Sequence, residues 1–131
     1  YNIDYFEEYI QPQLMLQKLK ETSVMIAPMN FNYKSGVISE KFTYTKGTGT
    51  FNDAIRFGLP TIVPQEYQVA QELVPCFLKY NSSLDLNRLM IDLLKNKQKL
   101  TELKNKTESL MKNYTLEECQ KKFKNIFSKF E

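Results

Sequence analysis

Short apolar runs alternate with helical patterns along the chain. Three mainly apolar runs occupy residues 24–28 (VMIAP), 60–64 (PTIVP) and 76–80 (CFLKY). Runs of this length are typical of strands that are buried on both faces of a parallel sheet. We therefore expect the three runs to be parallel neighbours in one sheet.

Helical patterns fill most of the chain between these runs. Residues 13–21 are rich in helix formers and predict a helix. Residues 50–58 predict about two helical turns that end at Gly58 as the residue after the C-cap. Residues 65–75 predict a further short helix, with Val69, Ala70 and Leu73 turned inward.

Three more helices are predicted after residue 80. The first follows a capping signal at Ser82, and the third follows a T-x-x-E capping box at Thr115. Apolar stripes of this kind usually face a core, and we expect all three to do so. The stripe of the third helix consists of Leu116, Cys119, Phe123, Ile126, Phe127 and Phe130.

The order of these elements predicts the fold class. Strands that alternate with helices favour an α/β fold, here a partial Rossmann-like parallel sheet flanked by helices, with further helices at the C-terminus. Residues 29–47 show no period and predict a long loop, which in a compact domain often carries function. Residues 3–10 are a candidate for one more strand. The sheet would still be thin, so we interpret residues 1–131 as a domain that is incomplete at its N-terminus.

Composition narrows the function classes. The net charge is +3, with 25% charged and 42% hydrophobic residues. Most lysines lie between residues 95 and 129, interleaved with Glu and Asn, which favours solvated helix faces over a nucleic-acid or membrane patch. We expect no nucleic-acid partner. The N-terminus has no signal-peptide pattern, so a cytoplasmic location is expected, with membrane association through a parent protein left open.

The chain contains no histidine and only two cysteines, Cys76 and Cys119. The absence of histidine excludes Ser-His-Asp and Cys-His catalysis and removes the commonest metal ligand. Both cysteines have apolar neighbours and are predicted to be small buried residues. We therefore expect neither a metal site nor a bound cofactor.

Glycine is scarce in this chain, yet residues 47–50 read GTGT directly before a predicted helix. Glycine lets the backbone approach a ligand, and the unpaired amides of a helix N-terminus favour phosphate. Thr48, Gly49 and Thr50 are therefore candidate phosphate ligands. Asp53, one turn into the helix, is a candidate ribose ligand. The same residues would equally suit a tight loop with Asp53 complementing the helix dipole, and the local pattern leaves both interpretations open.

The chain also resembles a known family over residues 14–130. The similar segments, in order, are TSVMIAP, DAIRFGLPTIVP, CFLKY, SSLDLNRLMIDLLKN and NYTLEECQKKFKNIF. Their order and spacing resemble the C-terminal half of GT-B fold glycosyltransferases, in particular the retaining group 1 families. The segment GLPTIVPQEYQVAQEL is also similar to inverting GT-B enzymes that use lipid-linked acceptors.

The resemblance implies roles for particular residues. In the retaining families two carboxylates serve the donor sugar nucleotide, and Asp53 takes the place of the second, which contacts the ribose. The place of the first falls on Thr45, which is not acidic, and Glu40 is the nearest upstream carboxylate. The basic diphosphate ligands of the family would precede residue 1.

The resemblance implies a donor-binding portion of a glycosyltransferase that uses a nucleoside diphosphate sugar. The acceptor, a glycan or a lipid-linked molecule, would bind through a missing N-terminal half, so we expect this chain alone to be inactive. Two alternatives stay open. One is a non-catalytic nucleotide-binding or interaction domain, suggested by Thr45, and the other is a nucleotide-sugar 2-epimerase, which typically depends on histidine.

Overall fold

The structure is a computed structural model, and it describes residues 7–29, 32–41 and 49–128. Five strands and seven helical segments occupy these residues. The strands are β1 (Met25–Ile26), β2 (Asn32–Ser35), β3 (Ile38–Lys41), β4 (Thr61–Pro64) and β5 (Phe77–Tyr80). The helices are α1 (Pro12–Glu21), α2 (Gly49–Phe57), α3 (Ser83–Lys95), α4 (Lys97–Met111) and α5 (Leu116–Phe127), with short 3-10 helices η1 (Gln71–Cys76) and η2 (Lys112–Tyr114).

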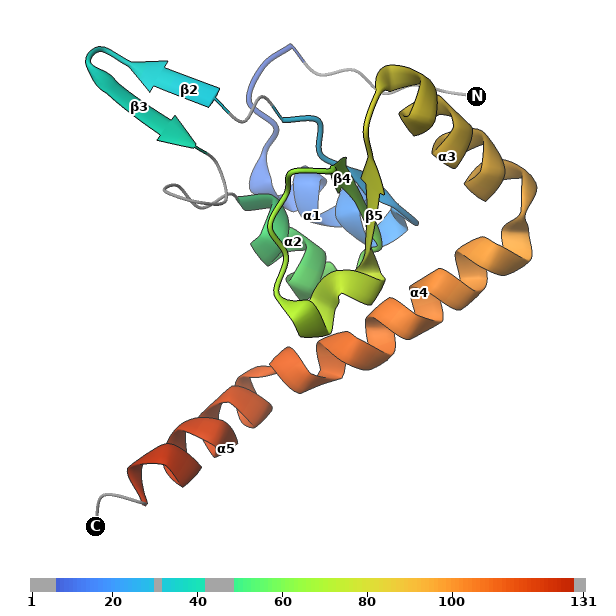
Figure 1. The fold of residues 1–131 in the computed structure, drawn as a ribbon. Helices are drawn as coiled ribbons and strands as arrows, with labels where there is room; N and C mark the ends of the chain where they lie inside the picture. Colours follow the sequence, from blue (N-terminus) through green and yellow to red (C-terminus); the bar gives the residue numbers. More distant parts are fainter. Residues whose placement is uncertain (1–6, 30–31, 42–48, 129–131) are drawn as a thin grey trace.

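A three-stranded parallel sheet forms the centre of the fold (Figure 1). The strand order is β1-β4-β5, so β4 lies between the other two. Met25 pairs with Thr61, and Thr61 pairs with Phe77 on its other side. The expected parallel sheet is confirmed, and the molecule is an α/β protein with helices flanking the sheet.

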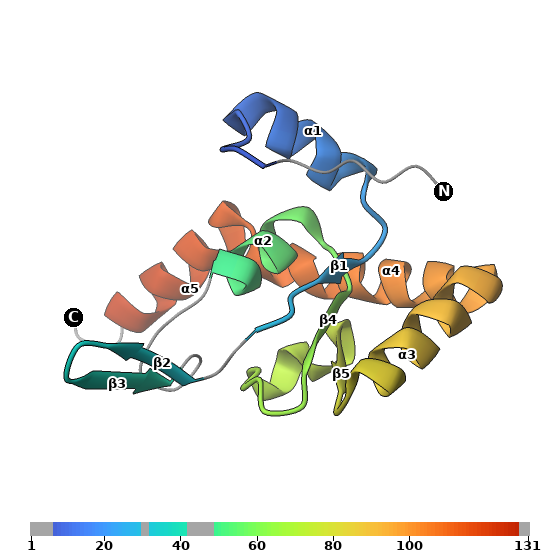
Figure 2. The same ribbon diagram turned by 90° about the horizontal axis from the view of Figure 1, so that it is seen from above.

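The core surrounds β4, whose four residues are all buried. Ile62 and Val63 are fully enclosed, and Cys76 at the end of η1 is equally buried. α4 contacts η1, and α3 contacts both α4 and β5. Figure 2 shows α1 set apart from the sheet and from the other helices. α1 has no buried residue, so the packed body consists mainly of the sheet, α2, η1, α3 and α4.

The capping signals at the start of α3 and α5 are confirmed. The Asp85 amide donates to Ser82 Oγ over 3.2 Å, and the Glu118 amide donates to Thr115 Oγ1 over 3.3 Å. Between them, Asn96 ends α3 and caps α4, because its Oδ1 accepts a hydrogen bond from the Lys99 amide. The helices α3, α4 and α5 therefore each begin where the sequence offers a side-chain acceptor for an orphan amide.

Two sequence predictions about secondary structure are wrong. Part of the segment expected to be one long loop is the antiparallel hairpin β2–β3, in which Gly36, with φ 59°, occupies the turn. The short helix expected over residues 65–75 is instead a turn at residues 65–66 and an irregular segment, followed by η1, which contains Pro75. Leu73 is buried as expected, but Val69 is only partly buried and Ala70 is exposed. Proline removes a backbone donor, which favours a short 3-10 turn over a regular helix here.

The third C-terminal helix also differs from expectation. α5 forms over the expected residues but has no buried residue, and Cys119 is exposed where burial was predicted. Cys76 is buried as predicted. Phe130, the last residue of the expected stripe, and most of the strand candidate at residues 3–10 lie outside the described residues; residues 7–10 form no strand.

Candidate functional site

α2 carries most of the predicted site, and its end is built by Gly58. Gly58 has φ 61°, and its amide donates to the Ile55 carbonyl over 3.3 Å. The next amide, that of Leu59, reaches back to the Ala54 carbonyl over 3.0 Å. These two bonds make a Schellman motif, which needs a left-handed residue and explains glycine at this position. The motif turns the chain directly into β4.

Apolar contacts hold α2 against the sheet. Ala54 is 1% exposed, and Phe51 and Ile55 pack against the core cluster. The Phe51 ring stacks on Phe77 of β5 with centroids 6.3 Å apart, and Phe77 stacks on Tyr67 at 5.9 Å. This row of aromatic rings joins three separate segments, so the position of α2 relative to the sheet is fixed by packing.

The predicted donor ligands on α2 share one part of the helix. Thr50 and Asp53 are three residues apart, which places them on the same face, and both are partly buried. Gly49 is the first residue of α2 and is exposed, with open space where a Cβ would lie. Thr48, the remaining candidate on this segment, and Thr45 lie outside the described residues. The structure thus brings together Gly49, Thr50 and Asp53 within the first turns of α2.

The connectivity places the start of α2 at a definite edge of the sheet. α2 lies between the parallel strands β1 and β4 in the chain, so it runs back from the carboxyl end of β1 to the amino end of β4. Its N-terminus therefore lies at the edge where the parallel strands end, and ligands of open α/β sheets bind at that edge. The unpaired amides and the helix dipole add partial positive charge there.

Glu40 belongs to a different part of the molecule. It lies on β3, is partly buried and faces Tyr33 of β2 in the register of the hairpin. The hairpin extends away from the three-stranded sheet (Figure 1). A helical scaffold therefore positions Asp53, whereas Glu40 is carried by a two-stranded ribbon, and isolated ribbons of this size are marginally stable.

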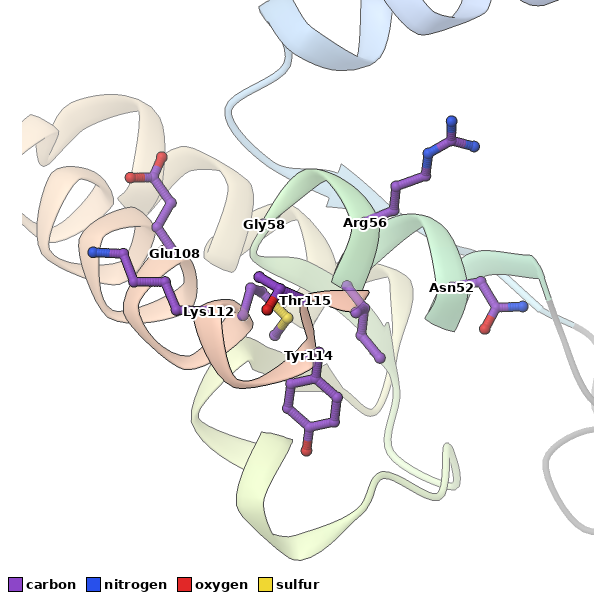
Figure 3. Close-up of a pocket in the computed structure, with 9 residues that line it drawn as sticks. Asn52, Arg56, Gly58, Glu108, Lys112, Tyr114 and Thr115 are labelled. Atoms are coloured by element: carbon purple, nitrogen blue, oxygen red, sulfur yellow. The ribbon is translucent and has the colours of Figure 1, made fainter. Parts of the chain in front are cut away.

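A cleft of about 610 Å³ lies on the other flank of α2, between α2 and the junction of α4 with η2. Thr115 lies toward the middle of the lining side chains, while Arg56 and Lys112 extend outward (Figure 3). Ile55 and Met111 also line the cleft. Asn52, Gly58, Glu108 and Tyr114 complete the lining. Neither Thr50 nor Asp53 lines this cleft, which sequence reasoning missed because no sequence pattern brings residues 52–58 beside residues 108–115.

Tyr114 links the cleft to η1. Its hydroxyl donates to Glu72 Oε1 over 3.1 Å, although the two residues are far apart in the sequence. Burial, reinforced by this hydrogen bond and by the negative charge of Glu72, raises the pKa of Tyr114. Tyr114 therefore stays protonated at neutral pH and acts as a hydrogen-bond donor that ties η2 to η1.

Cys76 is not an activated nucleophile. Cys76 is fully enclosed, and burial raises the pKa of its thiol despite a lowering contribution from Thr107 on α4. A buried, protonated thiol is a poor nucleophile and a poor metal ligand. Within residues 7–29, 32–41 and 49–128, no three His, Cys, Asp or Glu side chains gather closely enough to hold a metal ion.

Comparison of the chain with protein-family models, with curated proteins and with solved structures gave no match. The class of protein is defined by its fold alone. It is an α/β protein with a parallel sheet, and its helix α2 begins with Gly49 and Thr50 at the carboxyl edge of that sheet. None of the helices in the described part of the chain combines the length and the apolar character needed to cross a membrane.

Proposed function

We propose that this chain is the donor-binding portion of a GT-B glycosyltransferase, which transfers a sugar from a nucleoside diphosphate sugar to a glycan or lipid-linked acceptor. The observation that supports this most is the placement of Gly49, Thr50 and Asp53 on the first turns of α2, at the carboxyl edge of a parallel sheet. This arrangement suits a nucleotide with its phosphates near the helix start.

In this proposal, Asp53 accepts hydrogen bonds from the ribose hydroxyls. The α2 amides and the hydroxyl of Thr50, with Thr48 beside it in the sequence, interact with the diphosphate. The chemistry needs no metal, because the amides and the helix dipole stabilise the negative charge that develops on the departing diphosphate. The acceptor half of the protein would hold the attacking hydroxyl in line with the sugar.

Thr45 favours a second candidate, a nucleotide-binding domain without transferase activity. It stands where the retaining families place the carboxylate that contacts the donor sugar. The two candidates share the nucleotide site and differ in whether the donor sugar is transferred. The 2-epimerase alternative has no comparable support, because the chain contains no histidine.

Chemical-shift mapping tests the site on the 131-residue chain itself. We expect uridine and guanosine diphosphates and their sugar derivatives to bind weakly and to shift the amides of Gly49, Thr50 and Asp53. Asp53→Asn keeps the shape and removes the charge, so it should weaken binding by about tenfold or more, as expected for a charge-assisted hydrogen bond. Glu108→Gln is a matched control, because it removes a carboxylate from the cleft on the opposite flank of α2.

Two outcomes would contradict the proposal. One is a set of shifts confined to the cleft near Lys112, and the other is an Asp53→Asn affinity within about twofold of the parent chain, which corresponds to less than about 0.5 kcal/mol. In that case Asp53 complements the helix dipole and nothing more. Supplying labelled donor to a longer chain that includes an acceptor-binding half then separates transfer from binding alone.

A further inference from the structure

β1 lies at an open edge of the parallel sheet. The Met25 amide donates to the Pro60 carbonyl over 2.9 Å. The Ala27 amide donates to the Ile62 carbonyl over 3.0 Å. Backbone groups of successive strand residues point to opposite edges, so the amide and the carbonyl of Ile26 point away from β4. No strand in the described part of the chain pairs with β1 on that side, and Ile26 is 37% exposed.

The opposite edge of the sheet, at β5, carries a charge that the edge at β1 lacks. The Tyr80 carbonyl accepts a hydrogen bond from the Gln65 amide, so Tyr80 faces β4 and its neighbour Lys79 faces the outer edge. A lysine on an edge strand discourages pairing with a further strand. β1 consists of Met25 and Ile26, which are both apolar. The edge at β1 therefore offers backbone hydrogen-bonding groups to a further strand.

An apolar pocket of about 270 Å³ lies beside this edge. Val24 and Ile26 line it at the sheet, and Leu94, which is 57% exposed, lines it from α3. The other lining residues are Ser23, Ile62, Met90, Leu93 and Leu100. Sites for drug-sized ligands have volumes of about 300–1,000 Å³ and hold a few placed polar groups, so this uncharged pocket is better suited to apolar side chains. A strand beside β1 would present alternate side chains to it.

α1 has the direction of a crossover helix but lacks a packed face. Figure 2 shows that α1 runs in the opposite direction to β1, which follows it in the chain. Met15, Leu16 and Leu19 share one side of α1. Met15 is 43% exposed, and no residue of α1 is buried. A helix that runs back before a parallel strand is typical of the connection from another parallel strand in the same sheet.

The N-terminal segment has the pattern of such a strand. Residues 1–6, which lie outside the described part of the chain, read YNIDYF. Apolar or aromatic residues alternate with polar ones over the first five positions, as is typical of a half-buried strand. One face would consist of Tyr1, Ile3 and Tyr5, and the other would begin with Asn2 and Asp4. Residues 7–24, which contain α1, exceed the dozen or so residues that a parallel crossover needs.

We propose that residues 1–6 form a fourth parallel strand beside β1, with Ile3 and Tyr5 in the apolar pocket. The strand gives partners to the amide and the carbonyl of Ile26, and the crossover draws the apolar side of α1 onto the sheet. Asp4 then places a charge on the new outer strand, which discourages further pairing. The inference is independent of the proposed donor site, which lies on α2.

A second copy of the chain is a poorer match to the same edge. Pairing two β1 strands would use two residues from each copy, whereas a stable protein–protein interface uses about 20–30 residues on each side. It would also leave the apolar side of α1 without a partner. The segment 1–6 satisfies the edge, the pocket and α1 together.

Hydrogen exchange tests the proposal on the 131-residue chain and on the same chain without residues 1–6. The amides of Met25 and Ala27 donate to β4 and serve as internal references. Relative to these two amides, the Ile26 amide should exchange at least about tenfold more slowly in the full chain than in the shortened chain. The ratio separates the loss of a local partner from a general loss of stability.

Nuclear Overhauser contacts in the full chain test the direction of the proposed strand. We expect contacts between residues 2–5 and residues 24–27 that ascend together along both segments, as in a parallel pair. This measurement needs no variant, so it tests the proposal even where the shortened chain does not fold.

Matched substitutions test the pocket. Ile3→Gln and Leu94→Gln should each lower the urea midpoint of the full chain, and together they should lower it by less than the sum, because they remove the two sides of one contact. Leu84→Gln is the control, because Leu84 has a similar exposure of 60% on the same helix but does not line the pocket. It should leave the midpoint unchanged. Without residues 1–6, Leu94→Gln should also leave it unchanged.

Three results would overturn the proposal. They are an equal relative exchange rate of the Ile26 amide in both chains, contacts of residues 2–5 with an element other than β1, and equal midpoint shifts for Leu84→Gln and Leu94→Gln. Protection of the Ile26 amide that rises with protein concentration would also overturn it, in favour of a second copy. None of these measurements involves a nucleotide, so they stand apart from the test of the donor site.

Discussion

β4 and α5 both contain bulky apolar residues, yet their surroundings are opposite. All four residues of β4 are buried, and none of the twelve residues of α5 is. Ile62 of β4 is 0% exposed, whereas Ile126 of α5 is 55% exposed. The two isoleucines have the same side chain, so the difference comes entirely from what surrounds each element.

The comparison shows that an apolar pattern predicts an element and the face it will bury, but not the partner. β4 has β1 and β5 on its two edges and helices over its faces, and these partners come from both sides of it in the sequence. α5 has η2 as its main contact. The apolar stripe of a helix can be covered equally well by a core, by a second protein or by a lipid surface.

The largest expected effect tests this contrast directly. Ile62→Ala should lower the free energy of unfolding by about 2–5 kcal/mol, because it leaves a cavity at the centre of the sheet. Ile126→Ala should change it by less than about 0.5 kcal/mol, as is usual for an exposed position. Urea denaturation of both variants with an unchanged slope measures the difference. A loss above about 1 kcal/mol for Ile126→Ala would show that α5 packs on the body in solution.

The fold was largely predictable because its signals are local. The three apolar runs predicted the strands and their parallel pairing, although only the short η1 lies between β4 and β5, where a helix was expected. Gly58 marked the end of α2, and Ser82 and Thr115 marked the starts of two helices. Each signal is a backbone requirement that the neighbouring residues alone satisfy.

The errors arose where local sequence is ambiguous. The hairpin β2–β3 depends on pairing between Tyr33 and Glu40, and its strands are mostly polar, so no apolar alternation marked them. Cys119 was expected to be buried because its neighbours are apolar, but burial depends on a partner that the sequence does not identify.

Part of the candidate site was predictable, since Gly49, Thr50 and Asp53 share the start of one helix. The cleft was not, because it needs α2 and the α4–η2 junction side by side.

A second, smaller effect compares two glycines that have almost the same backbone conformation. Gly58 has φ 61° at the end of α2, and Gly36 has φ 59° in the hairpin turn. At both positions, a substitution by alanine should lower stability by about 1–2 kcal/mol, because a Cβ is unfavourable in the left-handed region of backbone conformation. At Gly58 the new Cβ would also lie 3.4 Å from Glu108 Cγ, whereas at Gly36 no atom lies within 4 Å.

Gly58→Ala should therefore lower the free energy of global unfolding by at least about 1 kcal/mol. Gly36→Ala should leave the urea midpoint unchanged if the hairpin opens separately from the body, and hydrogen exchange of the hairpin amides would report its local loss of stability. Equal shifts of the midpoint in both variants would show that the hairpin belongs to the cooperative unit, and would contradict this division of the molecule.

The smallest effect compares the N-caps of α3 and α5. Ser82 Oγ and Thr115 Oγ1 each accept a hydrogen bond from an amide of the helix that follows. Replacing either by alanine removes a local interaction of about 1 kcal/mol. α3 contacts β5 and α4, so Ser82→Ala should lower the global free energy of unfolding by about this amount.

α5 gains little from packing, so Thr115→Ala should reduce far-UV circular dichroism in the absence of denaturant while the urea midpoint stays constant. A lower midpoint in Thr115→Ala, matching that of Ser82→Ala, would mean that α5 unfolds together with the body. Because both caps make the same kind of amide-to-hydroxyl hydrogen bond, such a result would point to tertiary contacts of α5 that bury its apolar residues against the body.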